Sequence, residues 1–170
     1  MIDWVKFPGD EKWQSMNLTE VNITGIEAGF DLAFSDLNSK SFLRHAGLHY
    51  TWLDAGKESD GFTSLYVLDH LCHKLDLNMG HRITLNSGID WKLSLQDRAG
   101  GYQPYTDGTY SAEVPYKPVM VADVRAFYNF SKLQLFFEVT NLTDATIVDH
   151  ANVPQAGRWV MGGVKIKLRA

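Results

Sequence analysis

The chain has 170 residues, of which 45% are hydrophobic and 12% aromatic, and this composition excludes disordered, collagen-like and low-complexity proteins. A net charge of −4 disfavours a nucleic-acid-binding protein, and a single cysteine excludes an intramolecular disulfide framework and multi-cysteine zinc motifs. No apolar run reaches the length of about 18 residues that a transmembrane helix needs. The residues after Met1 lack the basic and apolar regions of a signal peptide.

Apolar residues alternate with polar or small ones along most of the chain, which is the period of a β-strand. This alternation predicts seven strands, in residues 24–35, 42–53, 71–80, 85–96, 118–130, 133–140 and 164–169, with residues 2–7 as the stub of an eighth. Most of these segments have the length of about 9–11 residues that a membrane-spanning strand needs, whereas strands of soluble proteins average about 5–6 residues.

The polar face of the predicted strands is rich in charge. It carries Glu27, Asp31, Lys74, Asp76, Asp90, Lys92, Asp123, Arg125, Glu138, Lys165 and Lys167. A face of this kind suits the wall of a wide, wet lumen. In a small closed barrel we expect it to be filled by ion pairs, such as Asp90 or Asp123 with Arg125, Lys74 or Lys92.

The predicted connections alternate in length. Residues 36–41, 84–86 and 131–132 form short connections, and residues 54–67, 98–115 and 143–157 form long ones. Short turns at one end and long loops at the other are typical of outer-membrane β-barrels, and so are aromatic residues near strand ends. Such residues here are Tyr50, Trp52, Tyr128, Phe130 and Trp159. The alternative is a soluble antiparallel sheet or sandwich with one face in a core and one face in water.

Four phrases carry a family resemblance. Residues 22–27 read N-I-T-G-I-E, residues 137–144 read F-E-V-T-N-L-T-D, residues 153–159 read V-P-Q-A-G-R-W, and residues 163–168 read G-V-K-I-K-L. In this order they resemble an upstream strand, the penultimate strand, the following loop and the last strand of TonB-dependent outer-membrane receptors. The resemblance extends along nearly the whole chain, but it lacks the second proline of the loop and the terminal aromatic residue of that family.

The resemblance implies an all-β fold, an antiparallel up-and-down meander of about seven to eight long strands. It implies that the chain is either part of an outer-membrane β-barrel or a small closed version of one. Residues 1–170 would form one barrel segment, without the plug domain and the TonB box. The implied function is uptake of a large nutrient of the siderophore, cobalamin or glycan class. The chain would supply barrel wall and extracellular loops, without enzymatic activity and without a cofactor.

The implied partners are outer-membrane lipid, the rest of the receptor barrel and its plug, and TonB through an N-terminal part that this sequence does not contain. No nucleic-acid partner is expected. The alternative function is a self-contained small β-barrel or sheet protein with a structural or surface-binding role.

Aromatic residues in the long connections are candidate ligand contacts, namely Trp13, Tyr102, Tyr105 and Tyr110. Four residues match motifs of the family and are expected to have structural roles: Asn141, Leu142, Gly157 and Arg158. For Gly157 the resemblance implies a requirement of backbone geometry, and for Arg158 it implies pairing at the base of the loop.

Alternation places His45, His49, His70 and Cys72 on one face, and these residue types can hold zinc or copper. Since they form no closed set of ligands at typical spacings, we expect polar lumen residues and no metal. Asp90, Asp123 and Glu138 have the chemistry of catalytic carboxylates, but we expect them to form lumen ion pairs. The sequence therefore predicts no catalytic residue.

Overall fold

The structure is a computed structural model that describes residues 2–17, 22–38, 40–56, 61, 63–64, 70–149 and 153–166. Regular structure in these residues is almost entirely β-strand, which confirms the all-β prediction, and helix α1 (Phe34–Leu37) has four residues. None of the helical segments among these residues is long and apolar enough to cross a membrane.

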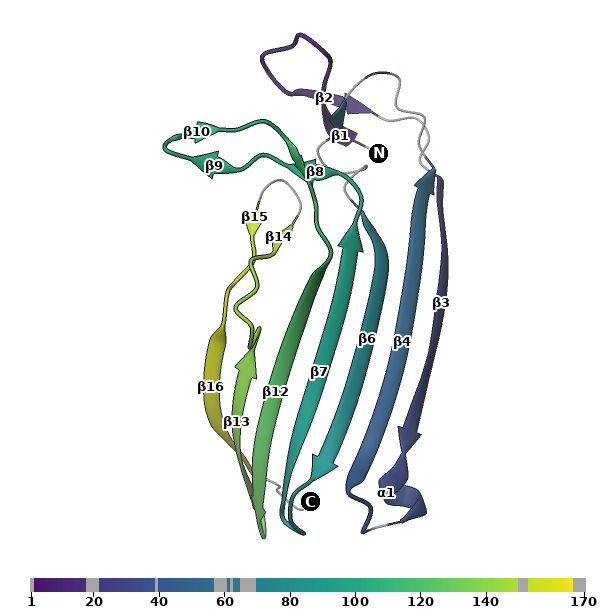
Figure 1. The fold of residues 1–170 in the computed structure, drawn as a ribbon, viewed down its shortest axis with the longest axis vertical. Helices are drawn as coiled ribbons and strands as arrows, with labels where there is room; N and C mark the ends of the chain where they lie inside the picture. The colour runs from purple at the N-terminus through teal and green to yellow at the C-terminus, as the bar shows by residue number, and fades with distance from the viewer. Residues whose placement is uncertain are drawn as a thin grey trace.

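Seven long strands form one antiparallel sheet in the order β16–β13–β12–β7–β6–β4–β3 (Figure 1). They are β3 (Asn22–Ala33), β4 (Leu43–Gly56), β6 (Leu71–Arg82), β7 (Ser87–Arg98), β12 (Val119–Phe130), β13 (Leu133–Thr140) and β16 (Trp159–Ile166). Each strand pairs with the next long strand along the chain, so the predicted meander is confirmed. Predicted strand residues 167–169 lie outside the described residues.

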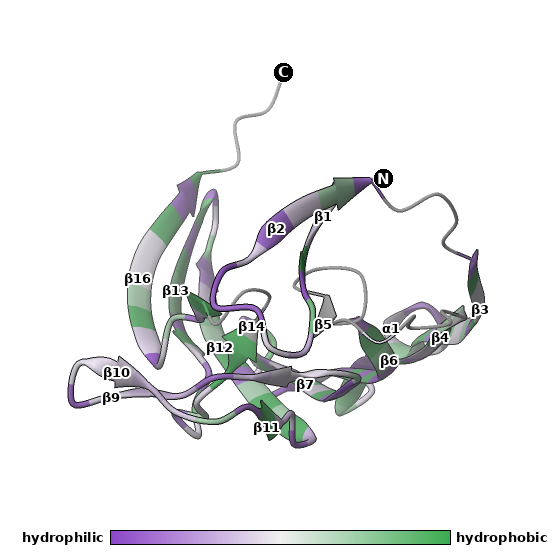
Figure 2. Ribbon diagram, turned by 90° about the horizontal axis from the view of Figure 1, so that it is seen from above, coloured by the Kyte–Doolittle hydropathy of each residue, from purple (hydrophilic) through white to green (hydrophobic). Residues whose placement is uncertain are grey.

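The sheet is open, because its edges β3 and β16 do not pair with each other in the described part of the chain. The described residues therefore do not form the small closed barrel that was one of the two expected arrangements. Seen from above, the sheet is curved like a trough (Figure 2). It is a single layer, and among the described hydrophobic residues only Val5, Ala122 and Val139 are buried.

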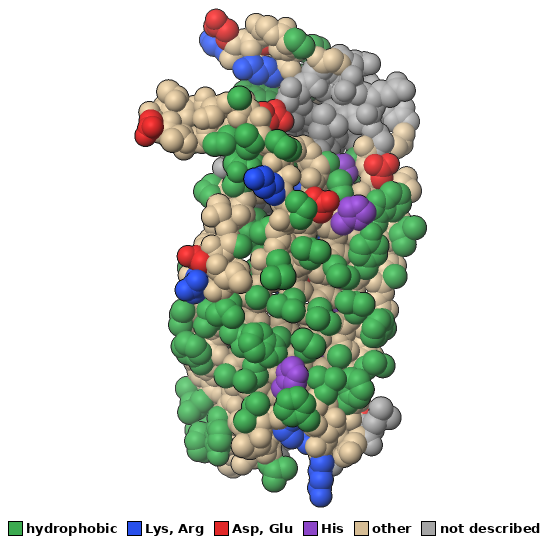
Figure 3. All heavy atoms as spheres, viewed as in Figure 1, with side chains coloured by type: hydrophobic (Ala, Val, Ile, Leu, Met, Phe, Trp, Pro, Cys, Tyr) green, Lys and Arg blue, Asp and Glu red, His purple; other side chains and the backbone are tan. Residues whose placement is uncertain are grey.

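The convex face of the trough is predominantly apolar (Figure 3), although register also places His73 and His81 on it. Register places Leu48, Leu77, Leu93 and Ala122 opposite one another on four successive strands of this face. We call the following residues, together with these four, the apolar face: Ile26, Phe30, Leu32, Tyr50, Trp52, Leu75, Met79, Ile89, Trp91, Leu95, Met120, Val124, Tyr128, Phe130, Leu133, Leu135, Phe137, Val160, Val164 and Ile166.

The opposite, concave face carries the predicted polar residues, and we call it the polar face. Several large side chains on it lie over a glycine of the neighbouring strand. A Cβ atom on Gly29 would come within 2.5 Å of His49 Nδ1, and one on Gly163 within 2.6 Å of the Phe136 ring. These pairs stand directly opposite each other in the sheet. The His49 and Phe136 side chains therefore occupy the space that a side chain at the opposite glycine would need.

The two ends of the sheet differ as the connection lengths predict (Figure 1). The turn end carries α1 and the tight β6–β7 and β12–β13 turns. The loop end carries the short strands β8 (Gly101–Tyr102), β9 (Tyr105–Thr106), β10 (Thr109–Tyr110), β11 (Val114–Pro115), β14 (Val148–Asp149) and β15 (Val153–Pro154).

The N-terminal segment does not add an eighth strand to the sheet. Strand β1 (Ile2–Lys6) pairs with β2 (Gln14–Asn17) and β5 (Thr63–Ser64) in a separate three-stranded sheet at the loop end. A turn that contains Gly9, with φ of 95°, brings β1 and β2 together. Pairing across such a short connection costs little loop-closure entropy, so β2 is a local partner of β1, whereas its other partner, β5, lies far along the chain.

Candidate functional site

Two adjoining cavities open on the polar face toward the loop end. The larger, of about 590 Å³, is lined by Arg98, Tyr102, Tyr116 and Lys117 among others. The second, of about 440 Å³, lies further along the same face and includes Lys74, Lys92, Asp123 and Trp159 in its lining. Gln96 and Ile147 line both cavities, so the two adjoin. This surface combines aromatic and cationic side chains at the mouth of the trough.

Of the four aromatic candidates, the structure places Tyr102 in the larger cavity, where its ring centroid is 5.5 Å from that of Tyr116. Tyr105 and Tyr110 face each other across the β9–β10 hairpin, with ring centroids 4.9 Å apart, and about two thirds of each residue is exposed. Trp13 is half-buried just before β2. Neither cavity is lined by Tyr105, Tyr110 or Trp13.

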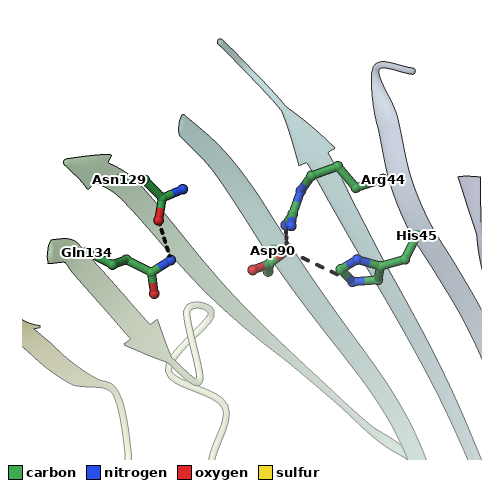
Figure 4. A network of polar contacts seen from close by, with 5 residues as sticks. All are labelled: Arg44, His45, Asp90, Asn129 and Gln134. Atoms are coloured by element: carbon green, nitrogen blue, oxygen red, sulfur yellow. Dashed lines mark hydrogen bonds and ion pairs between the residues drawn. The ribbon is translucent and has the colours of Figure 1, made fainter. Parts of the chain in front are cut away.

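Asp90 is the centre of a charged network toward the turn end of the polar face (Figure 4). Its Oδ1 accepts a hydrogen bond from Arg44 Nη2 and lies 3.9 Å from His45 Nε2. The Arg44 guanidinium also lies 4.8 Å from the centre of the Phe127 ring. Nearby, Gln134 Nε2 donates to Asn129 Oδ1 at 2.9 Å (Figure 4). Asp90 thus binds two strands of the wall to each other.

Sequence reasoning missed Arg44, because strict alternation puts it on the apolar face. The register between β4 and β6 shifts between Leu43 and His45, so Arg44 occupies a β-bulge. A bulge inserts one residue into one strand and re-aims its side chain. In the sequence, this bulge is indicated by two adjacent residues with ionisable side chains, Arg44 and His45.

The other ion pairs also differ from the expected ones. Arg125 Nη1 lies 3.8 Å from Glu138 Oε2, with its guanidinium 4.2 Å from the centre of the Phe136 ring. Lys74 Nζ lies 3.0 Å from Asp76 Oδ2 on the same strand. The pairings suggested for Asp90 and Asp123 in a small closed barrel are not among these ion pairs, and the described residues form an open sheet instead. Nearness in register is not sufficient, since rotamers and the bulge decide which charged atoms meet.

The four metal-ligand candidates are not gathered at one site, although two of them, His70 and Cys72, are in contact. His49 Nε2 lies 3.1 Å from the carboxylate of Asp31, and His45 belongs to the Asp90 network. His70 Nε2 lies 3.6 Å from Cys72 Sγ. His49 stands opposite Asp76, four positions from Cys72 on β6, which is about 13 Å along a strand. The described residues contain no group of three or more His, Cys, Asp or Glu residues that could hold a metal ion.

The family-motif residues form a compact structure at the base of the last long loop. Asn141 has φ of 49° and is 4% exposed, and its side chain both donates to and accepts from the backbone of Ala145, at 2.9 Å each. Its own backbone N–H donates to Asp123 Oδ1 at 2.8 Å. The next residue, Leu142, donates its backbone N–H to the Ala122 carbonyl at 2.7 Å. Asp123 is thus a structural acceptor.

Two separate motifs meet at Asp144. Its Oδ1 accepts a hydrogen bond of 2.8 Å from the backbone N–H of Arg158. A Cβ atom on Gly157 would lie 2.8 Å from the same oxygen. Gly157 is not among the glycines with positive φ, so it is required here for space and not for backbone conformation. The pairing expected of Arg158 at the loop base is made by its backbone N–H.

Trp159 is a correction to the expected aromatic girdle. It stands opposite Thr140 and lines the second cavity, on the polar face. The other four aromatic residues, Tyr50, Trp52, Tyr128 and Phe130, do lie on the apolar face near its two ends. Trp159 is five positions before Val164 in one continuous strand, so alternation along β16 puts it on the face of Lys165.

In comparisons with protein-family models, with curated proteins and with solved structures, the chain has no match.

Proposed function

We propose that this chain forms wall and extracellular loops of an outer-membrane β-barrel transporter of the TonB-dependent receptor type, which takes up a large nutrient of the siderophore, cobalamin or glycan class. One observation carries the proposal: a seven-stranded curved sheet has a predominantly apolar convex face and a polar concave face. This is the arrangement that a lipid-facing wall around a wet lumen requires.

The exposed apolar area supports lipid contact. Phe30 is 55% exposed, Phe137 54% and Val164 58%, and they lie on three different strands of the apolar face. Covering a side chain of this size is worth about 1.5–3 kcal/mol. A water-soluble monomer usually limits its largest apolar patch to roughly 300–600 Å². The free energy gained by covering the apolar face is therefore large, and a bilayer covers it without a second protein layer.

The height of the apolar face also fits a bilayer. On β12 it extends from Met120 to Phe130, ten residue steps. At about 3.4 Å per step this is about 34 Å along the strand, or about 26 Å along the membrane normal at a tilt of about 40°. On the paired strands, Asp54 and Asp97 lie beyond the loop-end margin of this band. The apolar band of outer-membrane barrels is about 25 Å tall.

The receptor type is supported by the family phrases. Asn141 closes the turn after the penultimate strand, and Asp144 joins this phrase to Gly157 and Arg158 before the last strand. The cavities at the mouth offer aromatic and cationic groups to a ligand. In that family the plug and TonB box make the energy-dependent movements, so we assign the static wall and mouth to this chain.

Tryptophan quenching by brominated phospholipids tests the proposal. One variant keeps Trp91, in the middle of the apolar face, and replaces the other four tryptophans with phenylalanine. The matched control keeps only Trp159, on the polar face. In vesicles of phosphatidylcholine brominated at mid-chain, we expect Trp91 fluorescence to be quenched several-fold more strongly than that of Trp159.

Equal quenching of the two tryptophans would argue against a two-sided wall. A monodisperse monomer in detergent-free buffer would refute the membrane assignment and favour the self-contained sheet protein instead.

A further inference from the structure

The outer edge of β3 is long and regular. All twelve residues of Asn22–Ala33 are exposed, and the strand pairs with β4 without a shift of register. Its other side carries backbone groups that pair with no described strand. Natural edge strands are protected by proline, charged residues such as lysine, bulges, short length or a covering segment. β3 contains no proline, no lysine and no bulge against β4, and its two charged residues, Glu27 and Asp31, lie on the polar face.

The directions of the strands define what can pair there. Six successive antiparallel pairings separate β3 from β16, so these two edge strands run in the same direction. Direct closure of β3 on β16 would create a parallel pair, whereas bacterial outer-membrane barrels are antiparallel with an even number of strands. An all-antiparallel wall therefore needs an odd number of further strands between these edges.

A second copy of the chain does not meet this requirement. Two copies with their loop ends on the same side of the membrane would join β3 to β16 as a parallel pair. An antiparallel pair between two β3 strands would place the two loop ends on opposite sides of the membrane. The occupant of the edge is therefore a strand of different sequence that runs opposite to β3.

The side chains of β3 define which side chains the partner strand must carry. Ile26 and Phe30 point to the apolar face and are 60% and 55% exposed. On the polar face, Asp31 contacts His49, but the neighbour of Glu27 on β4 is Thr51, which carries no charge. Opposite charges on directly opposed residues stabilise a sheet, and like charges destabilise it.

We propose that the β3 edge is an interaction surface for an antiparallel amphipathic β-strand, one of an odd number of strands that complete the wall. This strand places aliphatic or aromatic side chains beside Ile26 and Phe30 and a lysine or arginine facing Glu27. The inference rests on the proposed membrane-wall function, and it adds the direction, the parity and the charge of the missing partner.

A designed peptide tests the edge on the full chain in detergent micelles. Twelve-residue peptide R alternates apolar and polar residues and carries arginine where antiparallel pairing faces Glu27, and peptide E has glutamate there. Amide hydrogen exchange reads the backbone of β3. We expect peptide R to slow exchange at alternate β3 amides and to bind about threefold to tenfold more tightly than peptide E.

Two variants of the chain control the charge assignment. Glu27→Gln should reduce the difference between the two peptides to less than about twofold, since it removes the charge that separates them. Glu11→Gln, an exposed position near β2 at the loop end, should leave the difference unchanged.

The outcomes separate the inference from the proposed function. If Trp91 is quenched by brominated lipid but peptide R leaves β3 exchange unchanged, the inference is wrong and the wall assignment stands. If β3 amides are protected in a concentration-dependent way without peptide, a second copy occupies the edge and the inference is also wrong. An unquenched Trp91 overturns the wall and the need for closure together.

Discussion

Replacing Asn141 with alanine tests whether the loop base of the family motif stabilises the sheet. The side chain of Asn141 makes two hydrogen bonds to Ala145, and its backbone is in the left-handed conformation with φ of 49°. Asparagine visits this conformation more readily than alanine does, because its short polar side chain can bond locally. Asn141→Ala therefore removes two contacts and adds backbone strain.

The expected magnitude follows from these two terms. Each lost hydrogen bond is worth about 1 kcal/mol, and the left-handed conformation costs alanine roughly 1 kcal/mol more. We expect Asn141→Ala to lower the free energy of unfolding by about 3 kcal/mol. Asn141→Gly loses the hydrogen bonds but keeps the backbone freedom, so its loss should be about 2 kcal/mol.

Unfolding by guanidinium chloride in detergent micelles, followed by tryptophan fluorescence, measures these differences. Trp159 reports directly on this region, because it lies next to Arg158, whose backbone binds Asp144. Thr143→Ala, at an exposed position of the same turn, is the control and should change the free energy by less than about 0.5 kcal/mol. A loss below about 0.5 kcal/mol for Asn141→Ala, or equal losses for the alanine and glycine variants, would refute the reasoning.

Two further predictions use matched neighbours. Gly163→Ala should destabilise the sheet by about 1–3 kcal/mol in the same unfolding assay, because the new Cβ atom meets the Phe136 ring. The control Gly162→Ala should be nearly neutral, because a Cβ atom at Gly162 has one neighbouring atom within 4 Å, at 3.8 Å. Leu77→Arg, in the middle of the apolar face, should make the free energy of folding into the membrane less favourable by about 2–4 kcal/mol and reduce recovery of the chain in membrane vesicles. The control Asn78→Arg, on the polar face, should be recovered like the parent chain. Similar recovery of the two arginine variants would contradict the assignment of faces.

Alternation was sufficient to predict six of the seven long strands, whereas for β16 it predicted only residues 164–166 of Trp159–Ile166. In the β6 and β7 segments, apolar residues such as Leu75, Leu77, Leu93 and Leu95 recur on one face, with Asp76, Asn78 and Lys92 on the other. A period of two is the backbone geometry of a strand, so no tertiary information is needed to assign these residues to faces. The connection lengths likewise predicted which end of the sheet carries the loops.

Alternation failed where the backbone departs from a regular strand. The bulge at Arg44 moved a cation to the polar face, where it displaced the expected partners of Asp90. Trp159 is a different case, because alternation from Val164 back along β16 already puts it on the polar face, and the girdle assignment considered its place near a strand end without its face. The stub of an eighth strand paired locally, since β2 is nearer in sequence than any edge of the sheet.

The candidate site was predicted in part. Aromatic loop residues and the motif residues were visible in the sequence, but only Tyr102 of the four ligand candidates lines a cavity. The contact between Asp144 and the Gly157–Arg158 pair joins two phrases that are 14 positions apart. Such contacts depend on how the loop folds back on the sheet, and no local pattern encodes them.

The sequence by itself determined an all-β meander with one apolar face, one polar face and unequal ends, because these properties follow from side-chain order and connection length alone. Only the tertiary structure decided that the sheet is open and curved, which side is convex, which charges pair and that the edges β3 and β16 run in the same direction. These features depend on register, twist and the number of paired strands, which are properties of several strands together.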